Sequence, residues 1–232
     1  MRASDVMSTR VVTVTPEDSV LDAARKLHAH RISAMPVVDD DGRPVGMISE
    51  GDLLRRSEIG TNRKRGSWWL QLFADEPALA AEFVKSHGSK VAEVMTSPAE
   101  CVPENAELEE IAALLEEKHI KRALVTRGDA LVGVVSRADL VRALASTRKR
   151  KAPKTAPEDA EIRTAFLDSI ASESWFEPTT VNVIVTDGTV HLWGWVSSTE
   201  IIEALKVAAK AVPGVRAVDV HLGKAPPWIW GY

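Results

Sequence analysis

Two short stretches of the chain pair a serine with an aspartate three residues later, and these residue types at this spacing can recognise a sugar phosphate. Ser49 and Asp52 stand in GMISEGD. Ser136 and Asp139 stand in GVVSRAD, 87 residues further on. A carboxylate accepts hydrogen bonds from ribose hydroxyls, and the unpaired N–H groups of a helix's first turn favour phosphate. The same spacing also makes a capping box, which needs no ligand.

The two stretches occupy the same place in an internal repeat. DVMS recurs as EVMT and RISAMPVV recurs as HIKRALVT, each 88 residues later. Within each copy, the spacing of apolar residues predicts the order strand–helix–strand–strand–helix. Each serine then stands between the last strand and the last helix, and Gly46 or Gly133 would permit a tight passage there. Copies over 1–57 and 90–147 are expected to position both pairs alike.

This repeat resembles the CBS domain, and the tandem resembles a CBS pair, or Bateman module. The resemblance is carried by VMS, VTVTPEDSVLDAARKL and PVVDDDGRPVGMISEGDLL, followed by their second copies in the same order. It implies an α/β (α+β) fold in which two βαββα units pack about a pseudo-two-fold axis. It also implies a homodimer and a regulatory adenine nucleotide (AMP, ADP or ATP), with no tightly bound cofactor.

In CBS families that bind adenosine nucleotides, the serine contacts phosphate and the aspartate holds the ribose. By this resemblance each serine–aspartate pair marks one candidate site. The second site is favoured because Arg137 would attract a phosphate that Glu50 would repel. Its other candidate residues are His119, Lys121 and Arg122 for the phosphates, with Val102 and Ala123 against adenine. The alternative for these basic residues is a solvated turn.

Two segments with other compositions flank the second copy. The insert 58–89 contains Trp68 and Trp69 and a helix-like stretch, EPALAAEFVKSHG. The two tryptophans either pack within the chain or contact a partner. The linker 148–156 is basic and contains prolines, which is typical of a flexible connection.

From 157 to 223 the pattern changes to helix–hairpin–helix–strand. DGTVHLWGWV predicts a two-residue hairpin turn, SSTE predicts a capping box, and VPGVRAVDVHL supplies the last strand. This region resembles the BON domain, a small αββαβ fold, which implies attachment to phospholipid or to a protein partner. The tail 224–232 carries Trp228 and Trp230, and we expect one or the other to be at least partly buried on a CBS surface or on a dimer mate.

Composition excludes several classes of protein. The 232 residues carry a formal net charge of -4, so a protein built to bind nucleic acid is not expected. No long apolar stretch suggests a secretory signal or a membrane span, which favours the cytoplasm. The single cysteine, Cys101, is expected in the core, and His28 and His30 have the spacing of a helix edge. No catalytic or metal-binding pattern is found, so we expect no enzyme and no metal site.

Two main hypotheses follow, and a third, association with nucleic acid through the basic segment TRKRKAPK, would be supported by salt-dependent DNA binding. In the first, the CBS pair senses an adenine nucleotide and the BON domain couples this to a membrane or protein partner. In the second, the CBS pair has no ligand and serves as a dimerisation scaffold for BON-mediated phospholipid or protein interaction. Nucleotide titration separates the two, because only the first predicts binding.

Overall fold

The computed structural model describes residues 1–54, 84, 87–146 and 157–224. Trp68, Trp69, Trp228 and Trp230 therefore lie outside the described residues, as does the basic linker. The chain divides into two compact units, which are described separately. Unit 1 contains 1–10, 101–127 and the chain from 132 onward, and unit 2 contains 11–100 and 128–131.

Unit 2 holds most of the first repeat copy. Helix α2 (Val20–His30) begins after Ser19, whose hydroxyl accepts a hydrogen bond from the Asp22 N–H, and its apolar face packs in the core. Strands β1 (Ala34–Val38) and β2 (Pro44–Ser49) form an antiparallel pair, followed by α3 (Glu50–Leu53). The first expected strand is reduced to a single parallel bridge between Val14 and Val37.

Unit 1 holds the second copy with its full expected order. Strand β3 (Cys101–Pro103) pairs in parallel with β4 (Arg122–Arg127), and β5 (Ala130–Ser136) completes the sheet. Helix α6 (Leu108–Glu117) precedes β4, and α7 (Arg137–Ser146) follows β5. Val102 is buried here but Cys101 is exposed, so the expectation of a core cysteine is wrong.

The segments that lead into the two copies are exchanged. Helix α1 (Ala3–Val6), at the start of the chain, packs in the core of the second copy, whereas α5 (Val91–Val94) packs in the core of the first. The Ser8 N–H donates to the Val134 carbonyl, and the Thr96 N–H donates to the Met47 carbonyl at the equivalent place. The two copies therefore exchange their leading segments in the same way.

Gly46 and Gly133 make room for the exchanged segments. A Cβ atom on Gly133 would lie 2.5 Å from Met7 Sδ and 3.0 Å from the Ser8 carbonyl oxygen. A Cβ on Gly46 would lie 2.7 Å from Met95 Sδ. The repeated glycine is thus required by close approach to a neighbouring segment, and not by a tight turn as the sequence suggested.

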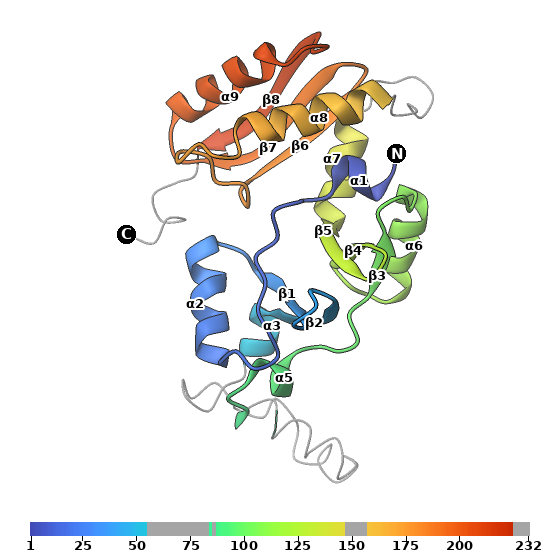
Figure 1. Ribbon diagram of the computed structural model, residues 1–232, viewed down its shortest axis with the longest axis vertical. Helices are drawn as coiled ribbons and strands as arrows, with labels where there is room; N and C mark the ends of the chain where they lie inside the picture. The colour runs from blue at the N-terminus through green and yellow to red at the C-terminus, as the bar shows by residue number, and fades with distance from the viewer. Residues whose placement is uncertain (55–83, 85–86, 147–156, 225–232) are drawn as a thin grey trace, which may run out of the picture. The chain divides into compact units, whose positions relative to one another are not determined.

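The C-terminal part of unit 1 has the expected αββαβ order. Helix α8 (Pro157–Ser169) precedes β6 (Val181–Thr186) and β7 (Thr189–Val196); α9 (Thr199–Ala211) and β8 (Ala217–Lys224) follow. Both helices lie on one face of the three-stranded sheet (Figure 1), where Phe166 and Leu205 pack on Val183 and Leu192. The predicted hairpin turn is present, with both of its residues at positive φ.

The opposite face of this sheet is also covered. All six residues of β6 are buried, although only alternate ones can face α8 and α9. Ile184 on the second face belongs to the core of the second repeat copy, beside Val6 of α1 and Ala143 of α7. Unit 1 therefore buries the second face of the small sheet against the helix that carries Asp139.

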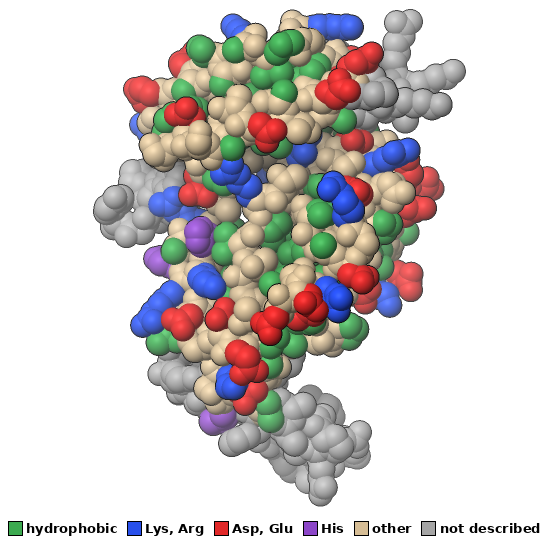
Figure 2. All heavy atoms as spheres, in the orientation of Figure 1, with side chains coloured by type: hydrophobic (Ala, Val, Ile, Leu, Met, Phe, Trp, Pro, Cys, Tyr) green, Lys and Arg blue, Asp and Glu red, His purple; other side chains and the backbone are tan. Residues whose placement is uncertain are grey.

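Charged side chains of both signs occur on the surface of the protein (Figure 2). Acidic and basic side chains are interspersed over the face shown in Figure 2. Among the residues that the structure describes, no helix combines the length and the apolar character needed to cross a bilayer.

Candidate functional site

In the first copy, Ser49 and Asp52 form the capping box that their spacing predicts. The Ser49 N–H donates to Asp52 Oδ2 at 2.9 Å, and the Ser49 hydroxyl donates to the same oxygen at 2.7 Å. The Thr96 hydroxyl lies 3.4 Å from Asp52 Oδ1. Asp52 is half-buried.

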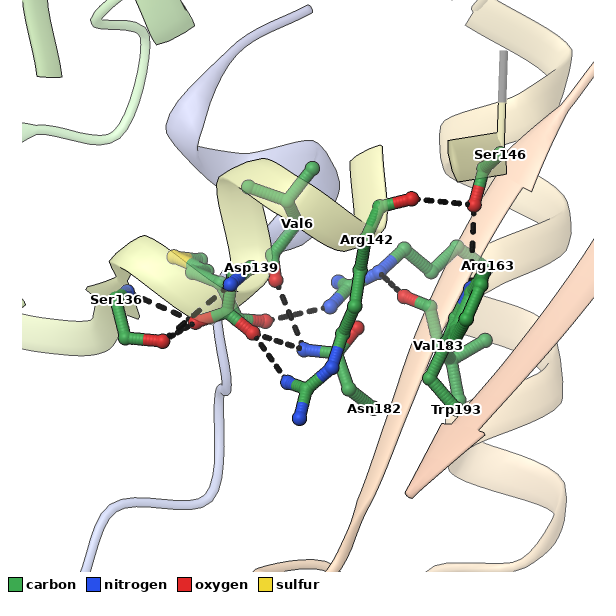
Figure 3. A network of polar contacts seen from close by, with 10 residues as sticks. Val6, Ser136, Asp139, Arg142, Ser146, Arg163, Asn182, Val183 and Trp193 are labelled. Carbon is green, nitrogen blue, oxygen red and sulfur yellow. Dashed lines mark hydrogen bonds and ion pairs between the residues drawn. The ribbon is translucent and has the colours of Figure 1, made fainter. Parts of the chain in front are cut away.

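In the second copy, the same box is present but the carboxylate is enclosed (Figure 3). The Ser136 N–H and hydroxyl donate to Asp139 Oδ2 at 2.8 and 2.7 Å. The Arg142 guanidinium donates to Asp139 Oδ1 at 2.7 Å. Only 3% of Asp139 is exposed, against the half-burial of its counterpart in the first copy.

The enclosing group is the second face of the small C-terminal sheet. Asn182 of β6 donates from Nδ2 to Asp139 Oδ1 at 3.2 Å and to the Val6 carbonyl at 3.0 Å (Figure 3). Trp193 of β7 donates from its indole N–H to the Ser146 hydroxyl at 3.1 Å. One atom of the repeated serine–aspartate pair is therefore hydrogen-bonded to another domain.

A buried arginine supports this contact from α8. The Arg163 guanidinium donates to the Val183 carbonyl at 2.9 Å and to the Met7 carbonyl at 2.6 Å. Burial lowers the pKa of Arg163 to about 10, while the charges of Asp5 and Asp139 raise it in part. Arg163 thus remains a cation at neutral pH, and the Asp139 carboxylate offsets part of the cost of burying it.

The basic candidate residues lie around the start of α7. The Arg137 N–H donates to the Lys121 carbonyl, so the turn before β4 lies against the first turn of the helix. The Arg137 side chain donates to the Leu115 carbonyl at 3.0 Å, which turns it toward α6. His119 is exposed and takes a positive φ of 53° just after α6 ends, a position that Arg31 occupies after α2.

The candidates for adenine face the core. Val102 and Ala123 are both buried and belong to the core cluster of the second copy, so a ligand could reach only their backbone. Arg122 is half-buried at the start of β4. No hydrogen bond or ion pair described for unit 1 joins the side chains of His119, Lys121 or Arg122 to the Asp139 carboxylate.

Sequence reasoning missed Arg142, Arg163 and Asn182 as parts of this network. One signal was available in VNVIVT, where Asn182 and Ile184 alternate with valines. The valines occupy one face of this strand, and the apolar Ile184 lies on the other. Apolar residues on both faces of a strand predict that both faces are covered. The identity of the covering helix depends on tertiary contacts between segments about 40 residues apart, which spacing alone does not give.

Comparisons with protein families agree with this architecture. The CBS domain model matches residues 3–58 and 91–146, and the BON domain model matches residues 158–223. These ranges coincide with the two repeat copies and the αββαβ region. The insert and the linker fall between them.

Individual relatives share the CBS portion. The chain is 33% identical over 135 residues to the CBS domain-containing protein CBSX1, chloroplastic, of Arabidopsis thaliana, covering 56% of this chain and 57% of that one. It is 28% identical over 148 residues to the uncharacterized protein MJ1404 of Methanocaldococcus jannaschii, covering 64% of this chain and 33% of that one. The chain therefore spans between a third and just over half of the length of these relatives.

One solved structure shares the fold of the CBS portion. It is a crystal structure of CBSX2 in complex with AMP, with a TM-score of 0.54 and 30% sequence identity. The match covers 63% of this chain and 99% of that one. With the matched families and the repeat geometry, it shows that the chain carries two CBS domains followed by a BON domain.

Proposed function

We propose that this chain is a regulatory module that binds an adenine nucleotide through its CBS domains and transmits the binding through its BON domain. The likeness to AMP-bound CBSX2 supports a ligand of this class. The duplicated serine–aspartate pairs, each at the start of a helix, supply a carboxylate for a ribose and N–H groups for a phosphate. Asp52 is half-buried whereas Asp139 is enclosed, so a ligand would have to displace more protein contacts at the second site than at the first.

The observation that carries the coupling is the hydrogen bond from Asn182 to Asp139 Oδ1. A ribose hydroxyl bound by Asp139 would need the same oxygen or the space beside it. Nucleotide bound to the second copy and the BON sheet docked on it are then alternatives. Only molecules with the BON sheet undocked can then bind nucleotide at the second site. The apparent affinity of that site is therefore the intrinsic affinity multiplied by the undocked fraction. A ligand that binds only the undocked state releases the BON face.

The second hypothesis, a scaffold without ligand, is favoured by one feature of the second copy. Every contact described for the Asp139 carboxylate is internal, as a purely structural capping aspartate requires. In that case the likeness to an AMP-bound protein reflects fold alone, and the chain binds no nucleotide at either copy.

Calorimetric titration of the full chain with AMP, ADP and ATP tests the proposal. We expect binding, and we expect Asp52→Asn to weaken the first site by about 10- to 100-fold through loss of charge-assisted hydrogen bonds. Asparagine keeps one acceptor oxygen for the cap, so the fold is retained. Asp41→Asn, on an exposed turn, is the matched control. If none of the three nucleotides binds, the result favours the scaffold hypothesis instead.

A further inference from the structure

We propose that the BON domain holds a divalent transition-metal site, with zinc as the best-fitting ion, formed by His191, Asp219 and His221. This site is separate from the nucleotide proposal and does not depend on it. The three side chains each offer one ligand atom, and these atoms all lie within 4.8 Å of one another. Two imidazoles and one carboxylate are a donor set that zinc uses in proteins, with a further position open.

Strand register brings the three residues together. Strands β7 and β8 are parallel, and His191 is paired with Asp219 directly across the sheet. His221 follows Asp219 by two residues and therefore projects from the same face. Each of the three is thus held by the backbone of a regular strand.

Two of the three distances between the ligand atoms match the edges of a tetrahedral site. Asp219 Oδ2 lies 3.4 Å from His191 Nδ1 and 3.3 Å from His221 Nε2. Ligand atoms about 2.0–2.1 Å from a tetrahedral zinc ion stand about 3.3–3.4 Å from one another. Both imidazole nitrogens converge on one carboxylate oxygen, whereas a simple histidine–aspartate ion pair needs only one imidazole.

Neighbouring side chains orient both imidazoles. His191 Nε2 lies 2.9 Å from the Thr186 hydroxyl oxygen, and that hydroxyl has the Ser146 carbonyl as its own acceptor. With the Thr186 hydroxyl donating to the Ser146 carbonyl at 3.5 Å, His191 Nε2 would donate to Thr186, and Nδ1 would present a lone pair to a metal ion. The ring of His221 stacks on Trp193, with centroids 3.7 Å apart. A hydrogen-bond partner such as Thr186 fixes the tautomer and orientation of a metal-ligating histidine, whereas stacking on Trp193 holds only the ring plane of His221.

The burial of the three side chains leaves a way in for an ion. The His191 side chain is 7% exposed, while those of Asp219 and His221 are 53% and 33% exposed. The site is therefore closed by protein on the side of His191. The remaining coordination position would face solvent on the side of Asp219 and His221. The three ligands form no pattern in the sequence, because they come from two strands that are separated by α9.

Competition between the full chain and a chromophoric chelator for zinc measures the affinity. We expect one zinc ion per chain, and at least about a 10-fold loss of zinc affinity in Asp219→Asn, since replacing a charged ligand by a neutral amide costs no less than removal of its outer partner. His28→Gln, which removes an exposed histidine from α2, is the matched control and should bind like the wild type. Circular dichroism verifies that both variants fold.

Cobalt gives an independent readout. Tetrahedral Co²⁺ bound at the site should show visible absorption bands that Asp219→Asn abolishes and His28→Gln retains. Long-range ¹H–¹⁵N spectra should assign the ligating nitrogens as Nδ1 of His191 and Nε2 of His221. The proposal is overturned if the wild-type chain takes up no zinc, or if Asp219→Asn binds zinc as tightly as the wild type.

Discussion

At the scale of single residues, Asp139 and Asp52 occupy equivalent positions but have different surroundings. Both carboxylates accept hydrogen bonds from the N–H and hydroxyl of the preceding serine. Asp139 alone also accepts from Arg142 and Asn182, and it is almost fully buried. The same substitution at both positions therefore separates the contribution of the helix cap to stability from the contribution of the buried hydrogen-bond network.

Asp139→Ala should cost about 3–5 kcal/mol of unfolding free energy, because it removes the ion-pair partner of Arg142 and one of the two anions, Asp5 and Asp139, that act on the buried Arg163. Asp52→Ala should cost only the value of a helix cap, about 0.5–2 kcal/mol. Urea denaturation of the two variants measures the difference. Equal losses would mean that the enclosure of Asp139 contributes nothing to stability.

The two glycines of GMISEGD should respond oppositely to alanine. Gly46→Ala places a Cβ 2.7 Å from Met95 Sδ and 3.0 Å from the Thr96 carbonyl oxygen, so we expect a loss of about 1–3 kcal/mol from overpacking. Gly51→Ala meets only the Ser49 hydroxyl at 3.4 Å, and the second copy already has Ala138 there. It should be neutral or stabilise the fold by up to about 1 kcal/mol. Thermal unfolding compares them, and a stable Gly46→Ala variant would refute the packing argument.

At the scale of elements, the order of helices and strands was predictable but their partners were less so. Periodicity and turn residues predicted the βαββα copies and the αββαβ region, since those signals are local. The exchange of α1 and α5, and the cover over β6, arise from contacts between distant segments. The same holds for the candidate site. The spacing of Ser136 and Asp139 predicted the hydrogen bonds between them, but it could not predict that Asn182 would donate to Asp139.

Arg163 links elements in a way that depends on pH. Its pKa is about 10 in the fold, well below the ordinary value that it regains when the chain unfolds, so below pH 10 both states carry the proton and stability does not vary through this group. Above pH 10 the folded state loses the proton first, so stability rises with pH through this group while the unfolded chain stays protonated. From pH 9 to 11 the wild type should gain about 1 kcal/mol relative to Arg163→Met. Urea unfolding at both values measures this, and a relative loss for the wild type would contradict the burial argument.

At the scale of the whole molecule, the resemblance to CBS pairs predicts a homodimer. Helix α7 exposes Val141 by 65% and Leu144 by 73%, three residues apart on one face of the helix. If this face contributes to association, Val141→Asp should shift the full chain from dimer toward monomer in light scattering. Val207→Asp, at a position 69% exposed on α9, is the matched control. A monomeric wild type at micromolar concentration would contradict the prediction.

The central claim is that the BON domain and an adenine nucleotide compete for Asp139, and the AMP affinity of an Asn182 variant tests it most directly. Asn182→Ala removes the donor to Asp139 while also removing a buried side-chain oxygen that has no hydrogen-bond partner among the described residues, so the fold should tolerate it. Thr164→Ala, on the exposed side of α8, is the control. Calorimetry should show that Asn182→Ala binds AMP about 10-fold more tightly than the wild type, the equivalent of about 1.4 kcal/mol. An affinity that is unchanged or weaker, with binding present in the wild type, would contradict the account.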